Sequence, residues 1–197
     1  DILVVNHYLL FADMMVKADG FGEVLPGANA FVLDEAHQIP EIAADYFGRS
    51  LSSRQIQELL QDLEKELRAN YGNIDQFAEQ IKPIREILLT TREQFGDGQL
   101  RQAWDSSLEQ TLNSSLQQLS ELLKVLEKVI EPKKAVSRGF ESLHRRAGEL
   151  YGGLSAFIDV AQNNCVRWIE TFSRTFVLHE TPIDISSRFK TELEQYP

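Results

Sequence analysis

The feature that most constrains this chain is a series of leucines and isoleucines at helical spacing between residues 51 and 163. Apolar side chains that recur every three or four residues line one face of an α-helix. Four such rows follow one another and are separated at Gly72, Gly96 and Pro132, residue types that end helices. Amphipathic helices joined by short connections pack as a bundle. The spacing therefore predicts a mainly α domain built on four helices.

The four predicted helices differ in their starts and lengths. The first begins at a capping serine, Ser52 or Ser53. The second contains Pro83, which we expect to kink or divide it. The third has the longest apolar row, from residue 100 to residue 130, and the fourth extends from about residue 137 to residue 158.

Glycines and strand-like segments follow in the last third of the chain. Gly148, Gly152 and Gly153 lie within the fourth predicted helix, and each costs about 1 kcal/mol relative to alanine. We expect them to mark close helix packing or a break. Residues 166–169 and 175–179 then predict two strands joined by a short polar turn, a small β element.

Residues 1–50 have a different pattern. Residues 2–5 and 30–33 are continuous apolar runs of strand length, typical of strands buried on both faces of a parallel sheet. One short helix is expected between them. Two strands do not make a stable sheet, so this part predicts an incomplete α/β lobe and a chain that is a piece of a longer protein.

Charge and cysteine content limit the function classes. The chain has 20 Lys and Arg against 30 Asp and Glu, a formal charge of -10, so any contact with nucleic acid must be local. One cysteine, Cys165, can form neither an intramolecular disulfide nor a metal cluster by itself. This cysteine content fits a reducing, cytoplasmic location. No apolar run approaches about 18 residues, so we expect no membrane contact.

The most specific motif is Asp34-Glu35-Ala36-His37, directly after the second apolar run. Ligands of open α/β sheets bind beyond the carboxyl ends of the strands. Carboxylates at that place can hold Mg²⁺ and orient water against a nucleotide γ-phosphate. Asp34 would hold the metal, and Glu35 would position or deprotonate the attacking water. The structural alternative is a solvated strand end.

This motif resembles the Walker B box, or motif II, of superfamily-two helicases. Asn-His-Tyr-Leu-Leu at 6–10, a long helical insertion after the box, and then Trp-Ile-Glu at 168–170 and Thr-Pro-Ile-Asp at 181–184 are similar to the XPD/DinG branch of DNA helicases. In that branch the insertion is the arch domain. The resemblance implies a partial first motor (RecA-like) lobe with the DEAH box at 1–50, a helical arch at 51–163, and return strands into the motor lobe at 164–197.

The resemblance also implies an activity. The family consists of ATP-dependent helicases that move 5′ to 3′ on single-stranded DNA and carry a 4Fe–4S cluster in the first motor lobe. Asp34 then corresponds to the Mg²⁺ carboxylate, Glu35 to the catalytic base, and His37 to a residue that couples nucleotide state to the second lobe. The structural alternative for His37 is a histidine at the start of a helix. The parent protein would use ATP and Mg²⁺.

Two elements of the family are absent from the printed sequence. No Gly-x-x-x-x-Gly-Lys-Ser/Thr loop occurs in it, so we expect no ATP hydrolysis by this chain alone. No cluster cysteines occur either, since Cys165 lies beyond the predicted arch. The iron–sulphur ligands are therefore expected in the parent and not in this chain.

A basic cluster lies around the start of the fourth predicted helix, and it comprises Lys133, Lys134, Arg138, Arg145 and Arg146. Such cations can neutralise the phosphates of single-stranded DNA, and bases can stack on a neighbouring aromatic such as Phe140. The other interpretation is a solvated charged face, with Phe140 and Trp104 in the core.

Two functions from different classes fit these patterns. The first is the arch and part of the first motor lobe of a DNA helicase, in which the arch guides single-stranded DNA. The second is a non-enzymatic helical module whose leucine-rich faces dock a partner protein. A parent reading frame with a phosphate-binding loop and four cysteines upstream of this chain would favour the first.

Overall fold

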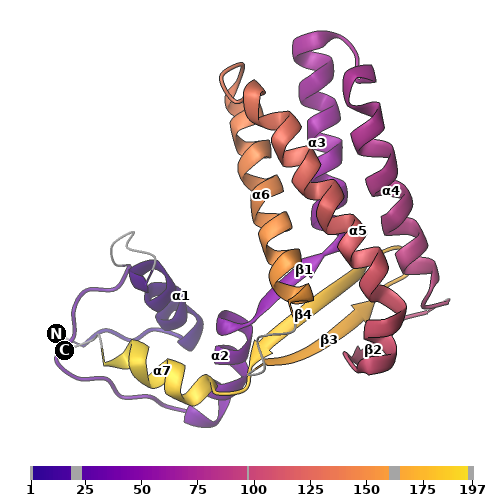
Figure 1. The fold of residues 1–197 in the computed structure, drawn as a ribbon. Coiled ribbons are helices and arrows are strands. Elements are labelled where there is room, and N and C mark those ends of the chain that lie inside the picture. The colour runs from indigo at the N-terminus through magenta and orange to yellow at the C-terminus, as the bar shows by residue number, and fades with distance from the viewer. Residues whose placement is uncertain (1, 19–23, 97, 160–164, 195–197) are drawn as a thin grey trace. The chain divides into compact units, whose positions relative to one another are not determined.

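The computed structural model describes residues 2–18, 24–96, 98–159 and 165–194. The chain divides into two compact units. Unit 1 holds the chain up to Arg49 and from Glu180 onward, and residues 164–166 group with it. Unit 2 holds the remaining residues between Ser50 and His179 (Figure 1).

Unit 2 contains the four-helix bundle that the apolar spacing predicts. Its helices are α3 (Ser53–Tyr71), α4 (Ala78–Glu93), α5 (Ser106–Ile130) and α6 (Arg138–Ile158). The 3₁₀ turns η2 (Asp75–Phe77) and η3 (Glu131–Lys133) connect α3 to α4 and α5 to α6. Both turns lie at the end of the bundle away from the sheet, which we call the far end.

Side chains and glycines set the helix ends. Ser52 caps α3 in a capping box, in which Ser52 Oγ accepts from Arg54 N (3.2 Å) and Gln55 Oε1 accepts from Ser52 N (2.9 Å). Gly72 ends that helix in the left-handed conformation, with φ 78°. Ser52, one of the two predicted caps, is therefore the N-cap.

The interior of two helices bears on alternatives that the sequence left open. Pro83 lies inside α4, which continues through it and is not divided. The helix α6 is also unbroken through its glycines. At Gly148 an added Cβ would lie 2.9 Å from Glu127 Oε1 of α5, so close packing is the correct alternative at that position.

The sheet has four strands in the order β1-β4-β3-β2. Their bounds are β1 (Arg49–Ser52), β2 (Leu100–Ala103), β3 (Cys165–Thr171) and β4 (Phe176–Pro182). β3 and β4 confirm the two predicted strands. β2 pairs antiparallel with β3, with Leu100 opposite Thr171 and Ala103 opposite Trp168.

The expected third helix is wrong at its start. Residues 100–103 form the edge strand β2, and α5 begins only at Ser106. Asp105 fixes this start, because its carboxylate accepts the N–H of Leu108 at 2.9 Å. Trp104 is partly buried and meets Phe157 edge to face, with ring centroids 4.9 Å apart. Its predicted place in the core is confirmed.

The core of unit 2 is formed by the apolar faces of all four helices and by three strands. Arg92 near the end of α4 is also buried. Its guanidinium donates to the carbonyls of Gly96 (2.6 Å), Gly98 (2.9 Å) and Phe172 (2.5 Å). Arg92 thus connects the loop after α4 to the β3–β4 hairpin.

Unit 1 has a smaller core around Phe11. Its helical elements are α1 (His7–Ala18), η1 (Ala36–Gln38), α2 (Ile39–Phe47) and α7 (Ile185–Leu193). The ring of Phe11 stacks on Tyr46 (5.4 Å) and Phe189 (5.2 Å). The helix expected between the two apolar runs is confirmed as α1.

The two apolar runs of unit 1 do not form the strands that their sequence predicts. Residues 2–5 and 30–33 have no strand structure, and Ile2, Val4 and Val32 are 95%, 89% and 94% exposed. A strand needs a neighbour for its backbone hydrogen bonds. The described residues of unit 1 provide none for these runs.

Among the described residues, no helix combines the length and apolar character that crossing a bilayer requires.

Candidate nucleotide and nucleic-acid sites

The DEAH segment lies between the second apolar run and α2. Asp34 Oδ1 accepts the N–H of Glu35 at 2.9 Å. Glu35 itself has a left-handed backbone, with φ 48° and ψ 41°, which costs about 1 to 2 kcal/mol for a residue with a Cβ. Both carboxylates are exposed. The segment therefore presents two adjacent acidic groups to solvent.

The structure also brings His37 to Glu35. His37 Nδ1 lies 3.1 Å from Glu35 Oε2, and both side chains are mostly exposed. This contact joins Glu35, the predicted base, to His37, the predicted coupling residue. The Asp34 carboxylate instead accepts the backbone N–H of Glu35.

The donors at this segment are of the type that Mg²⁺ prefers. Mg²⁺ in nucleotide sites is held by one or two carboxylates, with substrate phosphates and water completing the coordination. Asp34 and Glu35 are the type of ligand that a protein contributes to such a site. Among the described residues, no three His, Cys, Asp or Glu side chains gather into a complete metal cage.

Asn6 has a structural role at the start of α1. Its side-chain oxygen accepts the N–H of Leu9 at 2.8 Å, the hydrogen bond of an N-cap. His7 is the first residue of that helix. The contact visible at Asn6 is therefore a structural one, which fixes the start of α1.

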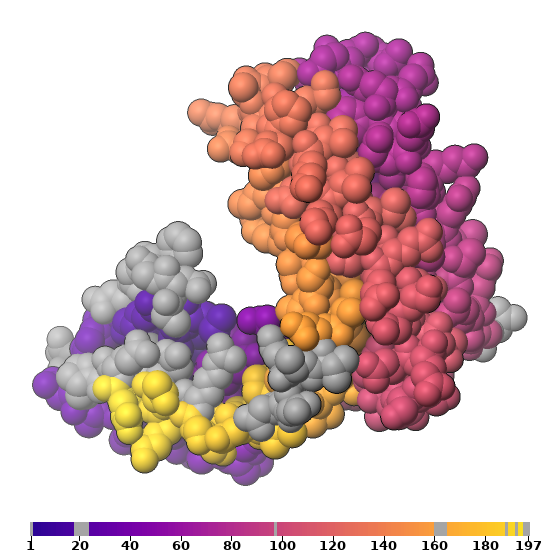
Figure 2. Space-filling model, viewed as in Figure 1, coloured from indigo at the N-terminus to yellow at the C-terminus, as the bar shows by residue number. Residues whose placement is uncertain are grey.

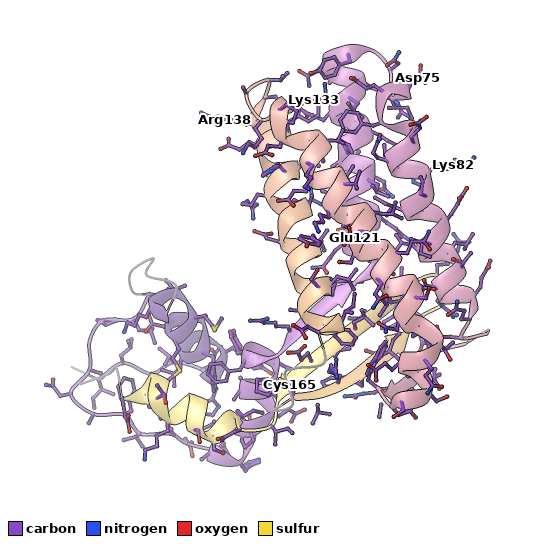
Figure 3. The ribbon with its side chains drawn as sticks, viewed as in Figure 1. Asp75, Lys82, Glu121, Lys133, Arg138 and Cys165 are labelled. Carbon is purple, nitrogen blue, oxygen red and sulfur yellow. The ribbon has the colours of Figure 1, made fainter. Side chains whose placement is uncertain are left out.

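The basic cluster occupies η3 and the first half of α6, at the far end of the bundle (Figure 3). Two of its five cations are held by other helices. Lys133 Nζ lies 4.4 Å from the ring centroid of Tyr71, a cation–π contact. Arg146 donates to Asp62 of α3 at 2.8 Å, and this hydrogen bond, followed by that from Lys65, lowers the pKa of Asp62.

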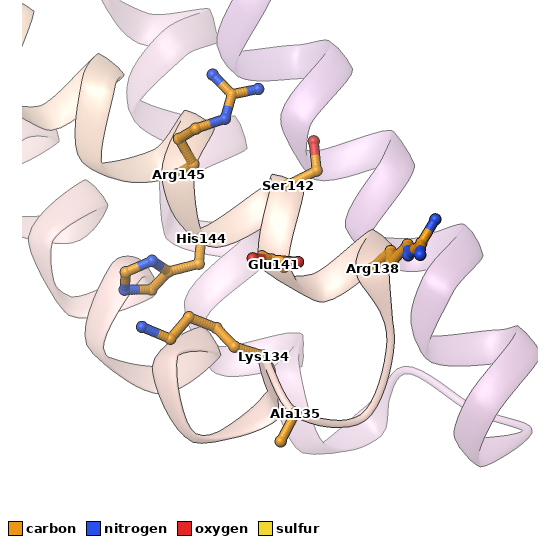
Figure 4. Close-up of a pocket in the computed structure, with 7 residues that line it drawn as sticks. All are labelled: Lys134, Ala135, Arg138, Glu141, Ser142, His144 and Arg145. Atoms are coloured by element: carbon orange, nitrogen blue, oxygen red, sulfur yellow. The ribbon is translucent and has the colours of Figure 1, made fainter.

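The other three cations line an open pocket on the outer side of α6. Its walls are formed by Lys134, Ala135, Arg138, Glu141, Ser142, His144 and Arg145 (Figure 4). The space-filling view shows the turn before α6 at the surface of the far end, beside the α3–α4 turn (Figure 2).

The ion pairs of the pocket cations differ in closeness. Lys134 Nζ is 4.0 Å from Glu131, and Arg145 is 2.6 Å from Glu149 on the same helix. Arg138 has no ion pair with any residue in the described ranges. The three side chains are exposed, so their charges face solvent.

Phe140 and Cys165 are the remaining residues singled out in the sequence. Phe140 is fully buried, which confirms its core interpretation and excludes it as a stacking surface for bases. Cys165 lies partly exposed at the start of β3. The partners Tyr71 and Asp62 were not predicted from the sequence, because they lie more than 60 residues before the cations that they contact.

Sequence comparison with known proteins covers the whole chain. No protein-family model matches it. The chain is 33% identical over 196 residues to the ATP-dependent DNA helicase YoaA of Haemophilus influenzae, and 33% identical over 201 residues to the protein of the same name from Escherichia coli. These alignments cover 98% and 100% of this chain and 31% of each relative.

A further relative is more distant. The ATP-dependent DNA helicase DinG of Photobacterium profundum is 31% identical over 87 residues, which is 43% of this chain and 12% of that protein. This chain spans about a third of the length of the two YoaA relatives. Along its whole length it is therefore homologous to a region of the helicases of the XPD/DinG family, the family that its motif II segment resembles.

Proposed function

We propose that this chain is the arch domain and part of the first motor lobe of an ATP-dependent DNA helicase that moves 5′ to 3′ on single-stranded DNA. The observation that carries the proposal is the Asp34–His37 motif. It occurs in a chain whose full-length relatives are named ATP-dependent DNA helicases. The rest of the motor belongs to the parent protein, since the chain spans about a third of these relatives.

In this proposal the exposed carboxylates have separate roles. Asp34 supplies an oxygen ligand for Mg²⁺, and the metal bound with ATP neutralises charge on the phosphates. Glu35 accepts the proton of the water that attacks the γ-phosphate. We assign to His37, which lies 3.1 Å from Glu35, the coupling of nucleotide state to the second motor lobe.

Two components of the motor are assigned to the parent. The printed sequence has no phosphate-binding loop with its Lys and hydroxyl, so we propose that the chain alone does not hydrolyse ATP. A 4Fe–4S cluster needs several cysteine thiolates, and Cys165 is the one cysteine here. This chain does not fit the cluster, whose ligands we place elsewhere in a cytoplasmic parent protein.

The bundle of unit 2 takes the role of the arch. We propose that it helps guide single-stranded DNA, and that the contact is made within the basic cluster of η3 and α6. Exposed cations at one end of an otherwise acidic chain support a local contact with phosphates.

The test is ATP hydrolysis by the full-length parent, with and without single-stranded DNA. We expect stimulation by DNA in the wild type and a loss of about 100-fold or more in Glu35→Gln, because the base is removed while the metal ligand remains. Glu41→Gln is the matched control, since Glu41 is an exposed carboxylate in the neighbouring helix α2.

Two results would contradict the proposal. One is hydrolysis that DNA does not stimulate, and the other is an undiminished rate in Glu35→Gln. Either result would make the partner-docking module the better account of the helical unit.

A further inference from the structure

The basic cluster is not uniform, and its five cations fall into two groups by what they contact. Lys133 and Arg146 are bound across the bundle, to the Tyr71 ring at 4.4 Å and to Asp62 at 2.8 Å. A cation already paired with a carboxylate or a ring must give up that contact before it can bind a phosphate. These two residues therefore belong to the packing of α3 against η3 and α6.

The second group faces solvent around the pocket on α6. Arg138 has no ion pair within the described ranges, and Lys134 has only a distant one at 4.0 Å to Glu131. Arg145 lies 2.6 Å from Glu149 on the same helix, and these side chains are 64% and 59% exposed. Surface ion pairs of this kind contribute little and exchange readily with other partners. The Arg146 and Asp62 side chains, which join two helices, are only 30% and 42% exposed.

The spacing of the second group suits a polyanion. Arg138 and Arg145 are separated by seven residues on α6, which places their Cα atoms about 10 Å apart along one side of the helix. Lys134 precedes them in the turn, and the hydroxyl of Ser142 lies in the same wall (Figure 4). A row of that length faces more than one phosphate of a nucleic-acid strand.

We propose that Lys134, Arg138 and Arg145 form a phosphate track for a single DNA strand, and that Lys133 and Arg146 take no part in it. This inference rests on the proposed function and specifies it, because it divides the predicted DNA-binding cluster into contacting and structural residues. Glu141 in the pocket wall opposes the cations and keeps the track weak. Weak, non-specific contacts suit a surface that DNA must slide past.

The test measures binding of a fluorescent single-stranded oligonucleotide to the 197-residue chain over a series of salt concentrations. Counterion release makes the logarithm of affinity fall with the logarithm of salt by about 0.7 for each phosphate neutralised on a single strand. We expect Lys134→Gln and Arg138→Gln each to reduce this slope by about 0.7, and to weaken binding about tenfold at about 20 mM salt.

The structure supplies matched controls for charge. Lys133→Gln and Arg146→Gln remove cations from the same cluster, and we expect the slope to stay as in the wild type. Lys82→Gln removes an exposed cation on α4, 3.9 Å from Glu86, on another helix of the bundle (Figure 3). It is also expected to leave the slope unchanged, and circular dichroism checks that every variant is folded.

Three outcomes would overturn the inference. The first is no measurable binding by the wild-type chain at the lowest salt concentration. The second is an equal change of slope in Arg146→Gln and Arg138→Gln. The third is equally tight binding of polyglutamate, which would assign the pocket to an acidic protein partner. Because the assay contains no ATP, its failure is distinguishable from a failure of the Glu35→Gln experiment.

Discussion

At the scale of single residues, Arg92 holds two loops of unit 2 together. It is buried and donates to three carbonyls, of Gly96, Gly98 and Phe172. We expect Arg92→Met to lower the free energy of unfolding by about 3 kcal/mol, because three hydrogen bonds from a buried, charged guanidinium are lost. Urea unfolding measures this change. Arg54→Met, at an exposed position on α3, should change it by less than about 0.5 kcal/mol.

A lysine at position 92 separates the effect of the positive charge from that of the hydrogen bonds. Arg92→Lys keeps the positive charge but replaces the planar fork of donors with one ammonium group. We expect intermediate stability. If Arg92→Met and the wild type unfolded at the same urea concentration, the three hydrogen bonds would not hold the loops.

The ion pair between Asp62 and Arg146 makes stability depend on pH. Hydrogen bonds from Arg146 and Lys65 lower the pKa of Asp62 below its unfolded value of 3.8. A carboxyl with a lowered folded pKa stabilises the native state above the unfolded pKa, and this contribution is lost as pH falls through the folded pKa. We therefore expect Arg146→Met to destabilise the chain modestly at pH 7 and less at about pH 3. A destabilisation that is equal at both pH values would assign the effect of Arg146 to packing.

At the scale of elements, the glycines of α6 have different surroundings. No atom lies within 4 Å of a Cβ added at Gly152, so Gly152→Ala gains helix propensity without a clash. We expect it to raise the free energy of unfolding by about 0.8 kcal/mol.

A Cβ at Gly139 would meet the carboxylate of Glu66, which also accepts a hydrogen bond from the Ser137 hydroxyl. Gly139→Ala should therefore be destabilising, and urea unfolding of both variants compares them directly.

The same elements show what the sequence could predict. Four helices follow from apolar periodicity, because each buries one continuous face in the shared core. Residues 100 and 104 continue that period by coincidence, but Asp105 caps the helix after them and Leu100–Ala103 pairs with β3. Periodicity describes one segment alone, whereas a strand is defined by its partner. The runs at 2–5 and 30–33 failed as strands for the same reason.

The candidate sites divide in a similar way. The DEAH motif could be recognised because its four residues are adjacent in sequence. The division of the basic cluster could not be predicted, because Tyr71 and Asp62 lie on another helix. Net charge and spacing locate cations, but only the fold determines which of them already have partners.

At the scale of the whole molecule, the exposed apolar runs predict self-association. Ile2, Val4 and Val32 leave apolar surface and unpaired backbone in solvent, which favours strand pairing between chains. We expect the chain to associate as its concentration rises, and the double variant Ile2→Lys/Val32→Lys to remain closer to 22.5 kDa. Sedimentation velocity measures this.

A surface leucine provides the control for this prediction. Leu89 is 60% exposed on α4, within a helix whose backbone is already hydrogen-bonded. Leu89→Lys should leave the association unchanged. A wild-type chain that stays monomeric at every concentration tested would show that the runs do not pair between chains.

The order of strands in the sheet has an evolutionary consequence. The chain enters the bundle through β1 and leaves it through β4, and these two strands are neighbours. A turn of a few residues can join adjacent antiparallel strands. The long segment between β1 and β4 can thus be inserted, deleted or exchanged in evolution as one unit, without a change in the path of the flanking chain. Relatives that differ in length should therefore differ in this segment.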